Sequence, residues 1–343
     1  MRVGIVGASG FTGVELLRLC ALHPDLEVVV AGADTQAGRP VSGLYPSLAA
    51  TSPGLVFTKV TTNDLSGLDV VFLALPHGES QLLAPELIGK VGVLVDLSAD
   101  FRLLDAAAYS KWYGKDHAAP ELLGRFVYGL PELFRSQLRG ASLIAAPGCY
   151  PTAAGLALAP LVRAGVIEPS GIIVDAASGV SGSGRKLAHE SHFNTVDEDF
   201  TAYCLLDHRH TPEIEQVIGA EVLFTPHLAP MNRGILATCY SRPRTHRSAA
   251  ADLKSEDVIG LLEEAYAHEP FVVVSAASPS TKATLGSNCA HLTARVDPRT
   301  GWVLSICAID NLTKGASGQA LQCANIALGI DETSGLPAAG VYP

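Results

Sequence analysis

The sequence predicts a two-domain α/β protein: a doubly wound parallel sheet first, then an α+β domain with a mixed, mainly antiparallel sheet. Up to about residue 146, short apolar runs alternate with helical stretches, which is the rhythm of βαβ units. Beyond about residue 170, longer strand-like runs dominate. At 343 residues, the chain is long enough for two domains of ordinary size.

The elements of the first domain follow from its apolar periodicity. Helices are expected over 12–22 and 80–88, where apolar residues recur at helical spacing. The short apolar runs that predict buried parallel strands are 3–6, 28–33, 69–74, 93–96 and 143–145. Residues that follow these strands should meet at the carboxyl edge of the sheet, where open α/β sheets bind ligands.

The second domain is expected to begin with a helix over 152–164. Residues 297–301 have the composition of a hairpin turn, and Ser255 is expected to cap a helix that runs to about residue 268. The predicted strands are 172–177, 222–224, 234–240, 290–296 and 302–309.

A final helix, 317–328, has apolar residues at helical spacing and is expected to pack back onto the first domain. We therefore predict a first domain of residues 1–148 completed by 315–343. Residues 149–314 form the second, which we expect to be the catalytic and oligomerisation domain.

Composition excludes several classes of function. A net charge of −10 argues against nucleic acid or an anionic membrane as the main partner. The longest charge-free stretch, 140–162, contains prolines that would break a spanning helix, and the opening residues read as a strand rather than a signal peptide. Seven cysteines without C-x-x-C spacing favour free thiols in the cytoplasm and no metal site.

A glycine-rich loop follows the first predicted strand and opens a helix. Gly7, Gly10 and Gly13 are spaced three apart, as where a chain turns tightly and its backbone approaches a pyrophosphate. The helix N-terminus adds N–H groups and positive potential. The loop predicts a Rossmann-type dinucleotide site, with a ligand-free glycine turn as the alternative.

Asp34, at the end of the second strand, lies where the adenosine ribose of a dinucleotide would bind. An acid there accepts from the ribose 2′-hydroxyl and repels a 2′-phosphate, so Asp34 taken alone favours NAD over NADP. Arg39 is the nearest cation in sequence for a 2′-phosphate. The alternative is that Asp34 is a solvated loop acid.

Cys149 is the candidate nucleophile because it lies between a strand end and a helix start. Pro151 suits the first turn, and the positive end of a helix lowers a thiol's pKa and favours the thiolate. Cys20, Cys307 and Cys323 fall inside apolar patterns and are expected in the core.

A thiolate chemistry needs a proton donor with a pKa near neutrality, which histidine supplies. His208 and His210 flank Arg209 just before a helix expected near Pro212, and their alternation places both rings on one side of an extended loop. Structural histidines at a helix N-terminus are the alternative, and the sequence does not choose between the two rings.

Several segments are candidates for binding anions. Residues 177–186 are rich in glycine and serine and end in Arg185 and Lys186, as in a phosphate nest, with a plain flexible loop as the alternative. Arg102 and Arg233 are candidate anion clamps. His77, beyond the 69–74 strand, is as suited to loop packing as to a cofactor contact.

Together these segments resemble the N-acetyl-gamma-glutamyl-phosphate reductase family, which is related to aspartate-semialdehyde dehydrogenase. The matching stretches, in family order along the whole chain, are Gly7 to Gly13, LALPHG at 73–78, LSADFR at 97–102, YGLPE at 128–132, PGCYPT at 147–152, Ser178 to Arg185, HRHTPEI at 208–214, RGILA at 233–237 and AIDNLTKG at 308–315.

The resemblance implies a glyceraldehyde-3-phosphate dehydrogenase-like fold, NADP(H), a thiolate at Cys149 and an acid/base from the HRH motif. We assign this acid/base role to His210, with His208 as its rival. The resemblance also implies that Asn311 and Lys314-Gly315 lie near the nicotinamide end of the cofactor. We predict cofactor contacts from Gly7, Ser9, Gly10, Phe11, Thr12, Gly13, Asp34, Pro76, His77, Ser181, Gly182, Asn311 and Gly315, and substrate contacts from Arg102, Arg185, Arg233 and Tyr203. Because Asp34-Thr35 stands where many relatives carry a Ser-Arg type stretch, NAD stays open as an alternative.

The implied reaction is reduction of N-acetyl-L-glutamyl 5-phosphate to the 5-semialdehyde in arginine biosynthesis, through a cysteine thioester. Tyr150-Pro151 favours this substrate over the carrier-bound aminoadipyl phosphate of a lysine-pathway relative, in which Asn-Ala tends to follow the cysteine. The family also implies a homo-oligomer, a dimer or a tetramer. The rivals are an aspartate-semialdehyde dehydrogenase and a non-catalytic dinucleotide sensor, in which Cys149 would be unreactive.

Overall fold

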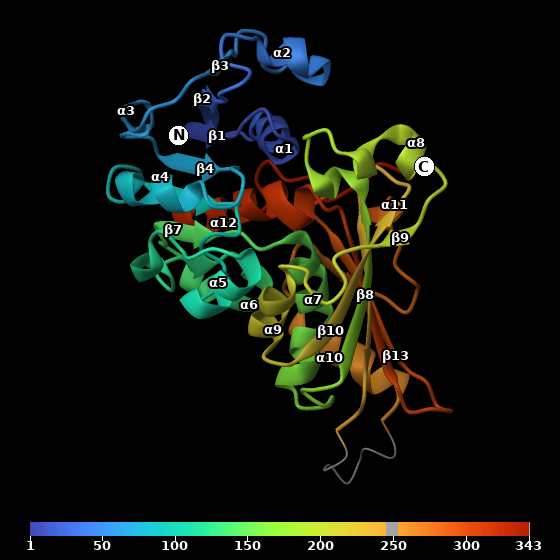
Figure 1. Cartoon of the computed structure of the whole chain (residues 1–343). Helices are drawn as coiled ribbons and strands as arrows, with labels where there is room; N and C mark the ends of the chain where they lie inside the picture. Colours follow the sequence, from blue (N-terminus) through green and yellow to red (C-terminus); the bar gives the residue numbers. More distant parts are fainter. Residues whose placement is uncertain (245–252, 343) are drawn as a thin grey trace. The chain divides into compact units, whose positions relative to one another are not determined.

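Two seven-stranded sheets organise the residues that this computed structural model describes, 1–244 and 253–342 (Figure 1). Each sheet belongs to one of two units of the chain. The first unit comprises Met1–Pro147 and Ala316–Pro337, and the second comprises Gly148–Gly315 and the residues from Ala338 onward. Within the described ranges, no helix has both the length and the apolar character that crossing a bilayer requires.

The sheet of the first unit is parallel throughout, with the order β3-β2-β1-β4-β5-β7-β6. This confirms the predicted doubly wound sheet, whose strand order reverses direction between β1 and β4. Its strands are β1 (Arg2–Val6), β2 (Glu27–Gly32), β3 (Phe57–Thr58), β4 (Val70–Leu73), β5 (Val93–Asp96), β6 (Val127–Tyr128) and β7 (Leu143–Ala145). The edge strands β3 and β6 were not predicted, because two residues are too few for a periodic signal.

Helices pack around this sheet, and one of them comes from the far end of the sequence. Helix α12 packs on α1, α6 and β5 of the first unit (Figure 1). The helices of the unit are α1 (Phe11–Cys20), α2 (Val41–Leu44), α3 (Thr62–Leu65), α4 (Ser80–Leu87), α5 (Ala106–Tyr113), α6 (Pro131–Leu138) and α12 (Gly318–Leu328), with 3₁₀ turns at Pro46–Leu48 and Pro120–Leu122.

The sheet of the second unit is mixed and mainly antiparallel, as the sequence predicted, with the order β12-β13-β14-β11-β8-β10-β9. The β8–β10 and β12–β13 pairs are parallel and the other four are antiparallel. Its strands are β8 (Ile172–Gly179), β9 (Thr201–Ala202), β10 (Val222–Ala229), β11 (Ile235–Ser241), β12 (Val272–Val274), β13 (Ala290–Val296) and β14 (Val303–Ile309).

Helices α7, α9 and α10 pack against strands of this sheet, and α7 is buried along most of its length (Figure 1). Nearly every residue of α7 from Tyr150 to Leu161 is apolar or small, so the helix has no polar face to present to water. The helical segments are α7 (Cys149–Arg163), α8 (Phe193–Val196), α9 (Thr211–Ile218), α10 (Ser255–Ala265) and α11 (Thr281–Thr284), with 3₁₀ turns at Val180–Ser183 and His189–Ser191 and a π-helical turn at Thr313–Ser317.

The hairpin predicted at 297–301 is confirmed, because β13 and β14 pair antiparallel across it. The prediction that Ser255 caps α10 is wrong. Lys254 is the N-cap, and its amide donates to the Asp257 carboxylate at 2.9 Å. The Ser255 hydroxyl instead accepts from the Val296 amide at 3.0 Å, because tertiary packing brings β13 alongside the start of the helix.

Candidate active site

The glycine loop between β1 and α1 has the form of a dinucleotide-binding turn. Gly7 has φ +86°, and a Cβ placed on it would lie 2.1 Å from the Ala74 carbonyl oxygen. A Cβ on Gly13 would lie 2.3 Å from the Gly7 oxygen, so a side chain would separate the helix from the strand. Both positions therefore require glycine. The ten-residue helix α1 begins directly after Gly10, where its N-terminal amides favour a phosphate.

Other predicted cofactor residues lie in or beside this loop of the first unit. Ser9, Phe11 and Thr12 are half-buried, and the Ser9 carbonyl accepts from the Tyr45 hydroxyl at 2.7 Å. The Thr12 carbonyl accepts from Ser317 Oγ at 2.9 Å. The loop is thus anchored from two distant parts of the sequence, which suits a preformed cofactor site.

Asp34 and Arg39 lie in one loop after β2, and both are exposed. The Arg39 guanidinium donates to the Gly43 carbonyl at 2.6 Å and to Gln36 Oε1 at 3.4 Å. This loop leaves the carboxyl end of β2, and the glycine loop leaves the carboxyl end of the neighbouring parallel strand β1. Both loops therefore lie at the same edge of the sheet. An acid and a cation are therefore both near the expected ribose position.

The loop after β4 exposes Pro76 and His77 and is held in place by the buried carboxylate of Asp100. Asp100 accepts from the Gly78 amide at 2.8 and 3.0 Å and from the Gln81 amide at 3.0 Å. Asp100 was not predicted as a site residue, although it lies in the segment that follows β5. An acid among small apolar residues was the available signal.

Arg102, a predicted anion clamp, is buried in the first unit. Its Nε donates to the Ala146 carbonyl and its Nη2 to the Leu97 carbonyl, both at 2.8 Å. These carbonyls lie just beyond the carboxyl ends of β7 and β5. The guanidinium thus connects two strand ends at the carboxyl edge of the sheet, where open α/β sheets bind ligands.

Cys149 is the first residue of α7, and Gly148 is its N-cap. Its side chain is half-buried, whereas Cys20, Cys239, Cys289, Cys307 and Cys323 are buried. Burial raises the pKa of Cys20 and of Cys239 to about 12, so these two stay protonated thiols. Cys149 instead combines access to solvent with the positive end of a 15-residue helix.

Glu213, in the first turn of α9, ties this helix start to the histidine segment. Its carboxylate is 1% exposed and accepts from the Gly148 amide at 2.8 Å. The residue before Cys149 is therefore bonded to the helix that begins directly after His210. Glu213 was not predicted from the sequence, because an acid in a first helical turn usually has a local role.

His208 and His210 lie side by side, with ring centroids 4.8 Å apart, and both contact the Tyr150 ring edge to face. The His210 amide donates to His208 Nδ1 at 3.1 Å, so the neutral His208 ring carries its proton on Nε2. Burial, together with the neighbouring Arg209, lowers the pKa of His208 to about 4. His208 is therefore uncharged near pH 7.

Two tyrosines complete the cluster. The Tyr150 and Tyr203 hydroxyls are 3.0 Å apart, and the Tyr150 hydroxyl also donates to the His227 carbonyl at 3.3 Å. Burial raises the pKa of both tyrosines, so both stay neutral. Tyr203, a predicted substrate contact, also lies against the His208 ring, at 5.6 Å between centroids.

Segments far apart in the sequence meet beside the glycine and serine loop of the second unit. Asn311 Nδ2 donates to Ser181 Oγ at 2.9 Å, and Asn311 Oδ1 accepts from the Gly234 amide at 2.7 Å. Arg233 Nε lies 3.1 Å from the buried Asp310 carboxylate. Gly182 and Arg185 are exposed.

The predicted site residues fall into two groups, one in each unit. The first unit contains the predicted cofactor residues before residue 80 and Arg102. The second unit contains Cys149, Tyr203, both histidines, Ser181, Arg233, Asn311 and Gly315. In the second unit the residues on either side of Cys149 contact Glu213 and the two histidine rings. Among the described residues, no cluster of His, Cys, Asp and Glu side chains is suited to holding a metal ion.

We expect the free energy of unfolding to decrease as pH falls from about 6.5 to about 4. His208 has a folded pKa near 4 and an ordinary value of 6.5, so the unfolded chain binds the proton first. The contribution of His208 to the free energy of unfolding is complete above pH 6.5, and about 2 to 3 kcal/mol of this contribution is lost as pH falls to 4.

Chemical denaturation at about pH 7.5 and about pH 4.5 measures this loss, with His208→Asn as the comparison. Asn has no titrating ring, and its Oδ1 can accept from the His210 amide. The variant should lose about 2 kcal/mol less than the wild type over this interval. Equal losses in both proteins would contradict the assigned pKa.

Comparison with known families covers both units. A model described as "Semialdehyde dehydrogenase, NAD binding domain" matches residues 2–141, and one described as "Semialdehyde dehydrogenase, dimerisation domain" matches residues 149–311. The boundary between the two matches falls at the start of α7, beside Cys149.

The chain is similar over its full length to curated proteins named N-acetyl-gamma-glutamyl-phosphate reductase. It is 51% identical to that of Symbiobacterium thermophilum, with 100% of this chain and 99% of the relative covered. It is 46% identical to those of Desulforudis audaxviator and Pseudomonas syringae pv. syringae, with 100% of each chain covered.

Solved structures confirm the fold. Aspartate semialdehyde dehydrogenase II of Vibrio cholerae, complexed with ASA, matches with a TM-score of 0.70 at 17% identity, covering 96% of this chain and 98% of that one. The aspartate semialdehyde dehydrogenase of Candida albicans with NADP matches with a TM-score of 0.65 at 14% identity, over the same shares.

Proposed function

Because this chain belongs to the N-acetyl-gamma-glutamyl-phosphate reductase family, we propose that it reduces N-acetyl-L-glutamyl 5-phosphate to N-acetyl-L-glutamate 5-semialdehyde and phosphate, in arginine biosynthesis. The observation that supports this most is the placement of Cys149. It is half-buried at a helix N-terminus, and the residues on either side of it contact the histidine segment: Gly148 through Glu213, and Tyr150 through both rings.

In this proposal the Cys149 thiolate attacks the carbonyl carbon of the acyl phosphate. The carbon–oxygen bond to phosphate breaks, phosphate leaves with the electron pair, and a thioester forms on Cys149. Phosphate is a good leaving group, so this half needs little acid assistance. The N-terminus of α7 favours the thiolate over the thiol.

We assign the proton transfer in the second half to His210. As the thioester is reduced, His210 donates a proton to the carbonyl oxygen and takes it back when the carbon–sulfur bond breaks, which releases the aldehyde and the thiolate. His208 suits this role less, because its Nδ1 is taken by the His210 amide and its pKa is near 4. His208 then serves to position the His210 backbone.

The substrate's phosphate and carboxylate are assigned to Arg102, Arg185, Arg233 and Tyr203. Cations that hold both anionic ends would fix the carbonyl carbon near the thiolate. Arg233 is partly neutralised by Asp310, and Arg185 is exposed, so Arg185 has the less compensated charge of the two. Their separate roles stay predictions.

The cofactor is proposed to be NADP(H), with NAD as the alternative because of Asp34. In the first unit Gly7 to Gly13 would hold the pyrophosphate, Asp34 would face the ribose, and Pro76 and His77 would line the site. In the second unit Ser181, Gly182, Asn311 and Gly315 are the proposed nicotinamide contacts. A bound nicotinamide cofactor supplies the hydride that reduces the thioester.

The test is phosphate-dependent reduction of NADP, and separately of NAD, by N-acetylglutamate 5-semialdehyde. The proposal expects absorbance at the reduced-nicotinamide wavelength to rise only when phosphate is present. L-Aspartate 4-semialdehyde, the substrate of the nearest enzymatic rival, should give a much slower rate. Equal or faster turnover of the aspartate compound would contradict the substrate assignment.

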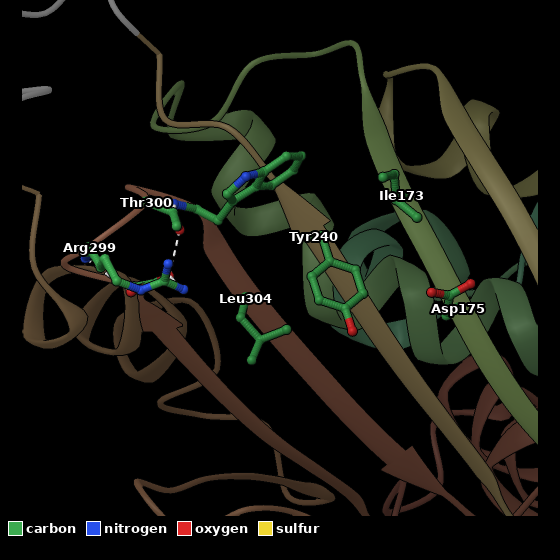
Figure 2. Close-up of a pocket in the computed structure, with 8 residues that line it drawn as sticks. Ile173, Asp175, Tyr240, Arg299, Thr300 and Leu304 are labelled. Carbon is green, nitrogen blue, oxygen red and sulfur yellow. Dashed lines mark hydrogen bonds and ion pairs between the residues drawn. The ribbon is translucent and has the colours of Figure 1, made fainter.

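We also propose that the chain forms a homo-oligomer through one face of the second sheet. This face, called the open face below, carries Ile173, Tyr240 and Leu304. Ile173, Tyr240 and Leu304 lie on neighbouring strands and line one shallow pocket on this face together with Asp175 and Arg299 (Figure 2). Apolar side chains gathered on a sheet face favour a second copy of the same face. The name of the matching family model, a dimerisation domain, supports this assignment.

Replacing Leu304 with Arg is expected to yield a monomer, because a two-fold interface brings the new charge into the contact twice. Light scattering after size-exclusion chromatography should give the mass of two or four chains for the wild type and of one for the variant. Leu82→Arg, at a side chain 60% exposed on α4 of the first unit, is the control and should leave the mass unchanged. An unchanged mass for Leu304→Arg would contradict the interface.

The reaction is proposed to take place in the cytoplasm. The seven cysteines, all of which lie in the described residues, form no disulfide with one another, which suits a reducing compartment.

A further inference from the structure

Gly315 lies directly against the nucleophile. A Cβ added to Gly315 would be 2.8 Å from Cys149 Cβ and 3.3 Å from Cys149 Cα. Carbon atoms do not approach each other to 2.8 Å without a shift of one of them. The atom that it meets is the first of the Cys149 side chain, so the shift would displace the sulfur or the start of α7.

This glycine is not required by its backbone conformation. Gly315 is absent from the positive-φ positions of the described residues, in contrast to Gly7 and Gly78. Alanine could therefore adopt the same backbone conformation. The contact with Cys149 is the physical reason for a residue without a side chain at this position.

Asp310 holds the turn that presents Gly315. Its carboxylate is fully buried and accepts from the amides of Leu312 and Thr313, both at 2.9 Å, and from the Gly286 amide at 2.7 Å. Its own carbonyl accepts from the Gly315 amide at 2.9 Å. One residue thus bonds to both ends of the turn from 310 to 315.

The same carboxylate also orients Arg233. Arg233 Nε lies 3.1 Å from Asp310 Oδ2, and Nη2 donates to Thr313 Oγ1 at 3.2 Å. The turn that contacts the nucleophile and a proposed anion-binding guanidinium therefore share one buried anchor. A shift in this turn would move both.

We infer that Gly315 and Asp310 are positioning residues for Cys149. Asp310 holds the 310–315 turn, and Gly315 packs against the Cα and Cβ of Cys149 and so determines where its sulfur lies. The inference deepens the proposed function and rests on Cys149 as its nucleophile. It assigns Gly315 a steric role toward the protein's own sulfur, in addition to the proposed cofactor contact. A misplacement of the order of 1 Å in a reacting atom costs about a hundredfold in rate.

The contact is tested by thermal unfolding of a double-mutant cycle that needs no substrate. Gly315→Ala is introduced into the wild type and into Cys149→Gly, where the clashing Cβ is absent. The inference expects a clear fall in melting temperature in the first background and a much smaller change in the second. Equal falls in both backgrounds would overturn it.

Activity and thiol reactivity supply the functional arm. Gly315→Ala should lower kcat for the semialdehyde reaction about a hundredfold with little change in KM for the cofactor. Its rate of alkylation at Cys149, followed by mass mapping to separate it from the exposed Cys204, should fall at least about fivefold, because a displaced sulfur loses the helix N-terminus that favours the thiolate. Alkylation and kcat within about twofold of the wild type would overturn the inference.

Gly260→Ala is the matched control. Gly260 lies in α10 of the same unit, and nothing lies within 4 Å of an added Cβ. It should leave both rates within about twofold of the wild type. Asp310→Asn, which places an amide donor among backbone amides, should lower kcat and the Cys149 alkylation rate in the same direction as Gly315→Ala.

If the wild type shows no reductase activity, the proposed function fails. The melting cycle and the alkylation rates still decide the inference, because neither measurement involves the substrate.

Discussion

Replacing Cys149 with Ser is expected to reduce turnover of N-acetylglutamate 5-semialdehyde by about a thousandfold or more, with little change in cofactor affinity. A serine hydroxyl is not ionised near neutral pH, and a helix N-terminus shifts a pKa by far less than the difference between an alcohol and a thiol. No thioester would then form. Initial rates with NADP and fluorescence titration with NADPH measure the two quantities separately.

Cys204→Ser is the control for this substitution. Cys204 is exposed and lies outside α7, the helix that begins at Cys149. Its replacement should leave the rate within about twofold of the wild type. A Cys149→Ser protein that retained a few per cent of the rate would contradict covalent catalysis. A wild-type Cys149 that resisted alkylation at mildly acidic pH would favour a non-catalytic dinucleotide sensor.

Replacing His210 with Asn is expected to reduce kcat by about a hundredfold or more, the usual contribution of general acid–base catalysis. Asn can hydrogen-bond to an oxygen but cannot donate and recover a proton at neutral pH. The loss should be seen in kcat, with little change in KM for the cofactor. Steady-state rates between about pH 5.5 and 9 measure this.

His208→Asn distinguishes the two rings. The substitution preserves an acceptor for the His210 amide, which His208 Nδ1 provides in the native protein. Because His208 is neutral near pH 7, its replacement should cost less than about tenfold in kcat. A larger loss for His208→Asn than for His210→Asn would reverse the assignment.

Three buried carboxylates share one structural role in the proposed site. Asp100 accepts from the Gly78 amide, Glu213 from the Gly148 amide and Asp310 from the Gly286 amide. Each is almost fully buried, and each bonds to a glycine of a loop that begins or adjoins a functional segment. If one of these hydrogen bonds broke, a buried carboxylate or amide would be left without a partner. That cost in free energy opposes movement of the loops.

None of the three carboxylates was recognised as an anchor in the sequence. Their partners are 22, 65 and 24 residues away along the chain, so no local pattern connects them. In the sequence, each acid is compatible with an exposed loop or a first helical turn. Burial, which converts such an acid into an anchor, is a property of the folded chain.

The sequence by itself determined the elements that depend on local chemistry. The Gly7 loop, the helix that opens at Cys149 and the 297–301 hairpin follow from periodicity, glycine spacing and turn composition, and the motifs in their order determined the family. The tertiary structure decided what depends on distant partners: the tautomer of His208, the carboxylate anchors, the contact of Gly315 with Cys149 and the open sheet face. The reason is physical: backbone conformation is set by neighbouring residues, whereas burial, hydrogen-bond partners and pKa values are set by residues that only folding brings together.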